Sequence, residues 1–418
     1  MIRRSRPFRR RALNIALLTH STNPRGGVVH CLELAEALIA LGHQVTLHAP
    51  VAPGGGLFRS TSARVCLIPE APAAGTLRER IERRIDTFRN WFSSPCHADF
   101  DLFHAHDGIG ANALFELRKD GRIPGYVRTV HHLEDSYGDA HLDALEMRSI
   151  LGADRLLCVS PSWSGKLLGR TGREAAVVGN GVNLARFGAR PSARDEPLRR
   201  RLGLGPGPVF LAVGGIEARK NTVATLQAFA RLRQTLATAQ LVVAGGASLL
   251  DHSACRQAFD AVLAQEGLAC AGPGEARSPG APATPLILAG VLEDADMPAL
   301  YRCADALVFP SRVEGFGLAV IEAMACGIPA VVSRIPPFTD FLGDADCLWA
   351  DPADPESIAR AMCRALMPGT RERLAARGAE VARRHDWAGC ARAHVQAYRS
   401  LLDELSASIP PLAEINHA

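Results

Sequence analysis

The sequence lacks the features of a membrane-spanning protein and of a disulfide-built one. No stretch approaches the roughly 18 uninterrupted apolar residues of a membrane span, so we expect a chain that does not cross a bilayer. No CxxC pair occurs among the eleven cysteines, and their number is odd. This pattern favours reduced thiols in a cytoplasmic protein over a disulfide framework or a structural zinc site.

Lysine is scarce, and the basic charge is unevenly spread. Only three lysines occur against 44 arginines, and six arginines lie within the first eleven residues. Without those six, 41 basic residues face 43 acidic ones, so we expect no nucleic-acid partner. Residues 1–12 lack the apolar stretch of a signal peptide and predict a disordered basic leader. An attraction of this leader to anionic lipid, at the inner face of the membrane, stays open.

The pattern of short apolar runs predicts two α/β domains. A chain of 418 residues is long enough for two cores. Apolar runs alternate with helix-like segments, which favours parallel sheets with crossover helices. The pattern restarts after 190–208, a stretch rich in Pro, Gly and charge. We therefore expect Rossmann-like domains over 13–195 and 196–385. The expected strands are 13–20, 44–50, 101–106, 126–132, 155–160, 209–216, 240–246, 285–292, 305–311 and 328–333.

Three segments stand outside this rhythm. Residues 272–285 hold three Gly and four Pro and predict a flexible surface insertion. Residues 386–405 predict a terminal helix that returns to the N-terminal domain. The helix expected over 77–92 carries an apolar stripe flanked by arginines. Packing of this stripe on its own domain is favoured over contact with an acidic membrane surface.

The stretch 314–322, EGFGLAVIE, holds two acids around a glycine-bearing turn that leads into a helix. The N-terminus of a helix after a parallel strand presents free N–H groups and a positive dipole end to anions such as phosphate. Gly315 and Gly317 let the backbone approach such a ligand closely. Glu322 can then reach vicinal hydroxyls such as those of a ribose, and Glu314 can hold a second sugar.

These features resemble glycosyltransferase family 4, the retaining group 1 glycosyltransferases. The stretch 314–322 resembles the E-x7-E signature of this family, whose GT-B fold has two Rossmann-like domains facing each other across a cleft. Further motifs follow in the family's order over roughly 13–405. They are GGVVHCLELAEALIALGHQV, RTVHH, VVGNGVNLARF, VGGIEARKN, GVLEDADMPALYRCADALVFPS and CGIPAVVS.

The resemblance implies a nucleotide-diphosphate sugar donor, linked to UDP, GDP or ADP, and roles for particular residues. Glu322 would bind the ribose, Lys220 would neutralise the departing phosphate in place of a metal, and His131 would lie beside the anomeric carbon. The implied catalytic residues are His131, Lys220 and Glu314. The implied donor-binding residues are Gly26, Gly27, Arg219, Lys220, Val291, Leu292, Glu314, Gly315, Phe316, Gly317, Leu318 and Glu322. No metal and no cofactor besides the donor is expected.

One position departs from the family pattern. The family commonly has an arginine where this chain has Gly215. Arg219 and Arg25 are the candidates for the second positive charge on the leaving diphosphate, and greater reliance on the helix dipole is the alternative. The implied reaction is transfer of a hexose with retention, through a front-face mechanism in which the leaving phosphate takes the acceptor's proton. The acceptor stays open among sugar, lipid and small metabolite.

Other classes of protein fit less well. The first turn has no GxGxxG, which disfavours a nicotinamide dehydrogenase. A GT-B phosphorylase, a nucleotide-sugar epimerase and a catalytically idle nucleotide-sugar-binding protein remain alternatives. The histidines at 104, 106, 131 and 132 have metal-ligand chemistry, but no acid or cysteine cluster is visibly arranged with them, so no metal site is predicted.

Overall fold

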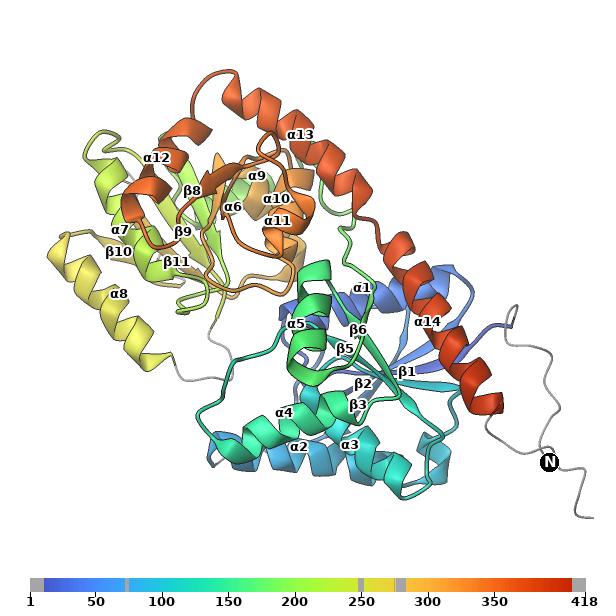
Figure 1. Ribbon diagram of the computed structural model, residues 1–418. Helices are drawn as coiled ribbons and strands as arrows, with labels where there is room; N and C mark the ends of the chain where they lie inside the picture. The colour runs from blue at the N-terminus through green and yellow to red at the C-terminus, as the bar shows by residue number, and fades with distance from the viewer. Residues whose placement is uncertain (1–10, 72–74, 247–251, 274, 276–282, 408–418) are drawn as a thin grey trace, which may run out of the picture. The chain divides into compact units, whose positions relative to one another are not determined.

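The computed structural model describes residues 11–71, 75–246, 252–273, 275 and 283–407 (Figure 1). The chain divides into two compact units. The first contains the chain up to Asn180 together with the chain from Trp387 onward, and the second is Gly181–Asp386. Most of the expected leader and most of the expected insertion at 272–285 lie outside the described residues. The boundary at Asn180 precedes the position 195/196 expected from composition, because the chain leaves the first sheet directly after its last strand.

The first unit holds a seven-stranded parallel sheet in the order β3-β2-β1-β4-β5-β6-β7 within the described residues. Its strands are β1 Asn14–Leu18, β2 Gln44–Val51, β3 Arg64–Pro69, β4 Leu102–Ala105, β5 Tyr126–Val130, β6 Arg155–Cys158 and β7 Ala176–Val177. Its helices are α1 Gly26–Ala40, α2 Leu77–Phe92, η2 Pro95–His97, α3 Gly108–Lys119, α4 Ala140–Leu151, α5 Pro161–Thr171 and α14 Trp387–Ala407. Strand β1 pairs with both β2 and β4, so the strand order reverses there, where open α/β sheets bind ligands.

The second unit repeats this plan in the order β10-β11-β9-β8-β12-β13-β14. Its strands are β8 Val209–Val213, β9 Gln240–Ala244, β10 Cys270–Ala271, β11 Leu286–Gly290, β12 Ala306–Phe309, β13 Ala330–Ser333 and β14 Leu348–Ala350. Its helices are α6 Asp195–Arg201, α7 Thr222–Arg233, α8 Ser253–Gln265, η3 Asp294–Asp296, α9 Met297–Arg302, α10 Leu318–Ala325, α11 Phe338–Phe341, α12 Pro355–Ala365 and α13 Thr370–Arg384. The order reverses between β8 and β12, which pair in parallel.

The prediction of two parallel α/β units is confirmed, but the edge strands were missed. The four strands absent from the sequence prediction, β3, β7, β10 and β14, each lie at an edge of a sheet. Both residues of β7 are exposed, and β3 is mostly exposed or half-buried. Strands β7 and β10 have two residues each and β14 has three, so their short apolar runs cannot be told from other apolar segments by pattern alone.

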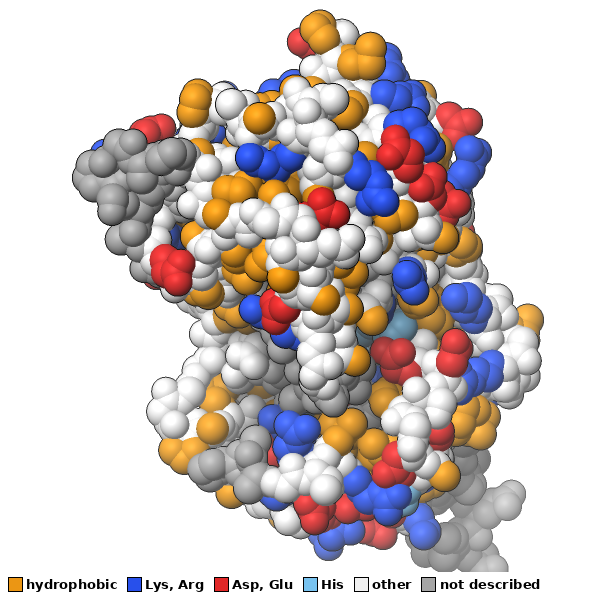
Figure 2. Space-filling view, turned by 90° about the vertical axis from the view of Figure 1, so that its left-hand side faces the viewer, with side chains coloured by type: hydrophobic (Ala, Val, Ile, Leu, Met, Phe, Trp, Pro, Cys, Tyr) orange, Lys and Arg blue, Asp and Glu red, His pale blue; other side chains and the backbone are white. Residues whose placement is uncertain are grey.

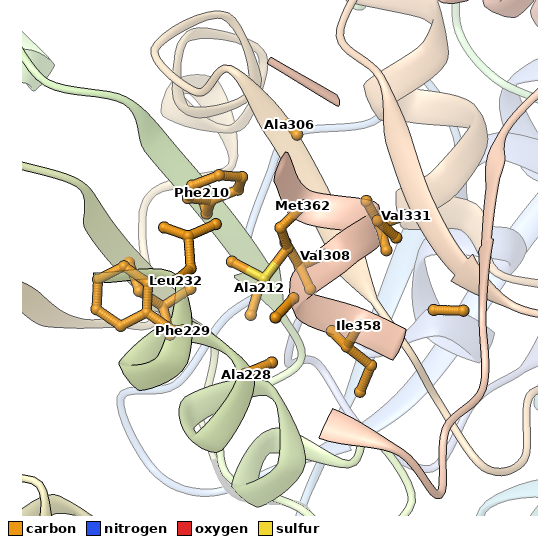
Figure 3. Close-up of a cluster of buried hydrophobic side chains, with 14 of the residues drawn as sticks. Phe210, Ala212, Ala228, Phe229, Leu232, Ala306, Val308, Val331, Ile358 and Met362 are labelled. Carbon is orange, nitrogen blue, oxygen red and sulfur yellow. The ribbon is translucent and has the colours of Figure 1, made fainter. Parts of the chain in front are cut away.

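Each unit has its own hydrophobic core. In the second unit, side chains from β8, β12, α7 and α12 interlock (Figure 3). Phe210, Phe229, Ile358 and Met362 are fully buried there. Such close packing fixes the strands whose ends carry the polar loops, so these loops start from rigid positions.

Helix α14 belongs to the first unit. Its apolar face, with Ala391, Val395, Tyr398 and Leu402, joins the core of that unit, in which α1 also packs. The hydroxyl of Tyr398 lies 2.7 Å from Nδ1 of His104, in the middle of the sheet. Helix α14 thereby places the Tyr398 hydroxyl beside a residue near the carboxyl end of β4.

Helix α2 buries its apolar stripe within the first unit. Ile85, Phe88 and Phe92 are buried, and the helix packs against α3. Among the described residues, no helix combines the length and the hydropathy that crossing a bilayer requires. On the face shown in Figure 2, positive and negative side chains are interspersed.

Candidate functional site

The polar loops after β8 and β12 meet at the carboxyl ends of these paired strands in the second unit. Lys220 follows β8, and Glu314 follows β12. The Nζ atom of Lys220 lies 2.7 Å from Oε1 of Glu314, and Nη1 of Arg219 lies 3.0 Å from the same oxygen. Three of the residues implied by the family resemblance are therefore in direct contact.

This ion cluster is buried yet charged. The Glu314 side chain is 6% exposed and that of Lys220 is 14% exposed. Burial alone raises the pKa of Glu314, but Lys220 and Arg219 outweigh it and hold that pKa below its usual value. Burial lowers the pKa of Lys220, and Glu314 opposes this shift. Nζ of Lys220 also lies 4.3 Å from the centre of the Phe309 ring, a cation–π contact.

The two loops are tied together by Asn221. Its backbone is left-handed, with φ of 59°, and its side-chain amide donates to the carbonyl oxygens of Pro310 and Pro352 at 3.1 and 2.7 Å. Gly214 makes room for the lysine, since a Cβ there would lie 2.7 Å from Cε of Lys220. These contacts set the direction from which Lys220 reaches Glu314.

The turn before α10, residues 315–317, has a backbone that a ligand can approach closely. Gly317 has φ of 97°, and a Cβ on it would lie 2.4 Å from Cε1 of Phe338, so only glycine fits. The Phe316 ring stacks on Phe341 at 4.9 Å, which turns the side chain into the protein. Gly315 is half-buried in the same turn, and Leu318 begins the helix. The first turn of a helix carries N–H groups without intrahelical partners, which suit an anion.

Glu322 lies on the second turn of α10 and is positioned by a residue that sequence reasoning missed. The hydroxyl of Tyr301, on α9, donates to Oε2 of Glu322 at 2.7 Å. Tyr301 is fully buried, and burial followed by the neighbouring carboxylate raises the pKa of its hydroxyl far above the usual range. The tyrosine therefore stays protonated and can only donate to the carboxylate. Tyr301 lies within the motif GVLEDADMPALYRCADALVFPS, but its contact with Glu322 was not predicted, because it depends on how α9 packs on α10.

A pocket of about 440 Å³ opens beside this cluster in the second unit. Its lining includes Gly215, Gly245, Gly246, His252, Arg256 and Gly290. Val291 borders Gly246, since a Cβ on Gly246 would lie 2.8 Å from Cγ2 of Val291, and Leu292 follows it half-buried. His252 and Arg256 come from α8 and its start, which carried no signal in the sequence.

The backbone explains why position 215 holds glycine. Gly215 has φ of 77°, and a Cβ there would lie 3.0 Å from the carbonyl oxygen of Gly246. An arginine at 215 would be strained in this conformation. Arg219 instead brings a guanidinium to Glu314, and its Nη2 also lies 3.6 Å from Oε2 of Glu217. Arg25, the other candidate, precedes α1 in the first unit.

In the first unit, the glycine turn and the histidine loop lie together. Gly26 and Gly27 begin α1, and a Cβ on Gly27 would lie 3.4 Å from Cδ2 of His131, whereas one on Gly26 would meet nothing within 4 Å. Nε2 of His131 lies 3.3 Å from Nδ1 of His106. Burial, with the neighbouring His30 and Arg128, holds the pKa of His131 well below its usual value, so the ring is neutral.

Side chains with metal-ligand chemistry also gather in the first unit. They form two sets that share a residue, namely His30 with His106 and His131, and His30 with Cys390 and His394. No disulfide links the ten cysteines that the structure describes.

Comparison with known families and relatives agrees with this geometry. The family model described as "Glycosyltransferase Family 4" matches residues 24–186, and the one described as "Glycosyl transferases group 1" matches residues 207–367. A phosphatidyl-myo-inositol mannosyltransferase of Mycobacterium leprae is 26% identical over 389 residues, covering 90% of this chain and 94% of that protein. The O-antigen chain mannosyltransferase B of Escherichia coli is 39% identical over 113 residues, which cover 27% of this chain and 29% of that relative's length.

Solved structures share the two-unit architecture. Sucrose-phosphate synthase of Thermosynechococcus elongatus superposes with a TM-score of 0.76 at 22% identity, covering 93% of this chain and 99% of that one. HepE of Anabaena, solved with UDP-glucose, gives a TM-score of 0.67 at 15% identity, covering 94% and 100%. At this level of identity the likeness establishes the fold, which is GT-B.

Proposed function

Because the chain belongs to the group 1 glycosyltransferases of family 4, we propose that it transfers a hexose from a nucleotide-diphosphate sugar to an acceptor, with retention of anomeric configuration. The observation that carries this proposal is the contact of Lys220 and Arg219 with Glu314 beside the glycine turn of α10. The cluster pairs the cations of Lys220 and Arg219 with the carboxylates of Glu314 and Glu217, so a phosphate there would compete with these carboxylates for the two cations. The donor would be linked to UDP, GDP or ADP, and the released product would be the nucleoside diphosphate.

The diphosphate is proposed to bind where fixed positive charge and backbone N–H groups converge. Lys220 and Arg219 supply the charge, and the backbone of Phe316, Gly317 and Leu318 supplies the donors. These groups would stabilise the negative charge that develops on the leaving phosphate, which is the work of a metal ion in other transferases. We therefore propose that the transfer step needs no metal ion on the diphosphate.

The remainder of the donor is assigned along α10 and the neighbouring pocket. Glu322, oriented by Tyr301, is proposed to accept from the ribose hydroxyls, and Glu314 to contact the transferred sugar. Val291 and Leu292 are proposed to lie on the nucleobase side, where the pocket of about 440 Å³ falls in the size range of small-ligand sites.

The reaction is proposed to follow from charge separation. Breaking the bond between sugar and phosphate leaves positive charge on the anomeric carbon. The acceptor's hydroxyl oxygen bonds to that carbon on the face that the phosphate leaves, and the leaving phosphate oxygen takes the proton of this hydroxyl. Retention then results without a covalent intermediate on either glutamate. In the first unit, His131 is assigned to the anomeric carbon, and Gly26 and Gly27 to the diphosphate, as the family resemblance implies.

The names of two relatives suggest which sugar to test first. Two relatives are named as mannosyltransferases, one of phosphatidyl-myo-inositol and one of an O-antigen chain, so mannose is the first hexose to test. Sugar, lipid and small-metabolite acceptors all remain candidates. We also propose that the protein acts in the cytoplasm, and that it contacts the inner face of the membrane only if its acceptor is a lipid.

Calorimetric titration with a panel of UDP-, GDP- and ADP-sugars, in buffer containing a chelator, tests the donor site. We expect one donor to bind in the micromolar range, and Glu322→Ala and Lys220→Ala to weaken it at least tenfold. Lys119→Ala, at an exposed lysine of the first unit, is the matched control and should leave affinity unchanged. Failure of every donor to bind overturns the proposal, and binding without transfer or hydrolysis identifies an idle binding protein instead.

A further inference from the structure

A cluster of buried imidazoles occupies the interior of the first unit, drawn from α1, the strand ends and α14. The ring of His30 is central, with ring centres at 5.2 Å from His106, 4.7 Å from His131 and 5.5 Å from His394. His30 and His394 are fully buried. Burial of this kind disfavours the charged form of a ring.

Hydrogen bonds fix where the proton of each of these two rings resides. Nδ1 of His394 lies 2.9 Å from the carbonyl oxygen of Cys390, and a carbonyl oxygen only accepts, so Nδ1 carries the proton. Nδ1 of His30 likewise donates to Oδ1 of Asn180. Each Nε2 therefore carries a lone pair, and neither has a hydrogen-bond partner among the described residues.

His104, another histidine of the cluster, has a hydrogen-bond partner at each ring nitrogen. Nδ1 of His104 lies 2.7 Å from the Tyr398 hydroxyl, and its Nε2 lies 2.8 Å from Oγ1 of Thr129. Buried polar atoms are ordinarily paired in this way. In the cluster the Nε2 atoms of His30, His106 and His394 lack such a partner within the part of the chain that the structure describes, and those of His30 and His394 can each give a lone pair to a ligand.

We propose that His30, Cys390 and His394 bind a zinc ion. One candidate ligand atom from each residue lies within 4.8 Å of those of the other two. Imidazole nitrogen and thiolate sulfur are the ligands that zinc prefers, and ligating histidines characteristically donate the other ring N–H to a carbonyl. On binding, the thiol of Cys390, which now donates to the Gly179 carbonyl at 3.5 Å, releases its proton to solvent as the zinc–sulfur bond forms. A water molecule can complete the tetrahedron.

The other candidate set is less suited to the ion. His106 and His131 already bond to each other at 3.3 Å, so one nitrogen of that pair donates to the other. The set with Cys390 also joins α1 to α14, two helices that lie on either side of the second unit in the sequence. A zinc ion there would hold the last helix in the first unit. This role is independent of donor chemistry.

Metal analysis of the full chain, purified without a polyhistidine tag, tests the proposal. We expect about one zinc per chain by mass spectrometry, and at least a fivefold loss of zinc in Cys390→Ser and in His394→Ala. His104→Ala is the matched control within the cluster and should keep its zinc. Absence of zinc from the wild type, with no uptake of added zinc, overturns the proposal, as does retention of zinc in both ligand variants.

A second measurement covers variants that fail to fold. Cobalt(II) added to the chelator-treated wild type should give a thiolate-to-metal charge-transfer band and the visible bands of tetrahedral coordination. A cobalt spectrum without a thiolate band rules out Cys390 as a ligand and overturns the assignment. We also expect chelation to lower the Tm of the wild type and to leave that of Cys390→Ser unchanged. Zinc content and Tm are read without any donor, so they stand or fall separately from the transfer reaction.

Discussion

The two units share one architecture but place opposite kinds of polar group at the carboxyl ends of their strands. In the first unit, His106 and His131 follow β4 and β5 as neutral rings. In the second unit, Lys220 and Glu314 follow β8 and β12 as an ion pair. Burial penalises charge in both places. A buried histidine avoids this cost because its ring is uncharged at neutral pH. Lys220 keeps its charge because the carboxylate of Glu314 lies beside it.

Buried polar groups in the two units therefore suit two kinds of ligand. Fixed positive charge in the second unit suits the negative charge of a phosphate. Lone pairs on neutral imidazoles in the first unit suit a metal ion or a proton.

Removal of the buried cation should have the largest effect. Lys220→Ala deletes the ammonium proposed for the leaving phosphate and leaves Glu314 with Arg219 as its remaining cation. Loss of one preorganised charge that faces a transition state lowers kcat by roughly 10² to 10³. We expect kcat/KM for transfer to fall by about 10³, measured by release of the nucleoside diphosphate. Lys166→Ala, at an exposed lysine of the first unit, should remain within about twofold of the wild type.

If Lys220→Ala retained activity within tenfold, fixed charge in the second unit would not drive the reaction. Lys220→Arg refines the test, because it keeps the charge but changes its shape. Partial activity in this variant would show that charge matters more than the compact ammonium, and no activity would show that the fit against Glu314 matters as well.

The two glycine turns should respond differently to the same substitution. Gly317→Ala forces a left-handed φ of 97° and a contact of 2.4 Å with Phe338, whereas a Cβ on Gly26 meets nothing within 4 Å. Backbone strain and overpacking each cost roughly 1 to 3 kcal/mol. We therefore expect Gly317→Ala to lower the free energy of unfolding by about 3 kcal/mol and Gly26→Ala by less than about 1 kcal/mol, in urea titrations. Equal losses would contradict the geometry of the α10 turn.

Acid should weaken the first unit before the second. The pKa of His30 is 6.5 when unfolded and about 4 when folded, so the unfolded chain binds more protons below pH 6.5. Stability from this ring is present above pH 6.5 and is lost as the pH falls toward 4. At pH 5 the loss is roughly 2 kcal/mol for His30 alone. The pKa of Glu314 lies below 4.5, so its contribution persists until the pH is lower still.

Hydrogen exchange at pH 7 and pH 5, in the presence of a chelator, measures this difference. Amides of β4 should lose protection at pH 5 by at least tenfold more than amides of β12. A uniform loss of protection across both units would show that the histidine cluster does not govern the acid response.

The sequence predicts local features well and contacts between distant segments poorly. The turn at 314–322 and the central strands are local patterns of glycine and apolar residues, and both appear as expected. Three of the four edge strands, β7, β10 and β14, were not predicted because they are only two or three residues long. The contact of His30 with α14 was not predicted from the sequence either, because its partners on α14 are more than 350 residues away in the chain. The face of α14 was predictable, but the direction in which Cys390 and His394 point depends on how the helix docks.

The same limit applies to Tyr301, which yields the smallest predicted effect. Tyr301→Phe removes only the hydroxyl that donates to Glu322 at 2.7 Å and keeps the buried ring. A single hydrogen bond to a charged group contributes roughly 1.5 to 3 kcal/mol, and part of this loss is offset because the carboxylate can still bind the ribose. We expect donor affinity to fall three- to tenfold by calorimetry, with kcat almost unchanged, because the phosphate site around Lys220 is untouched. A fall in kcat with unchanged affinity would instead mean that Glu322 acts on the reacting end of the donor, and the division of α10 between ribose and diphosphate would have to be redrawn.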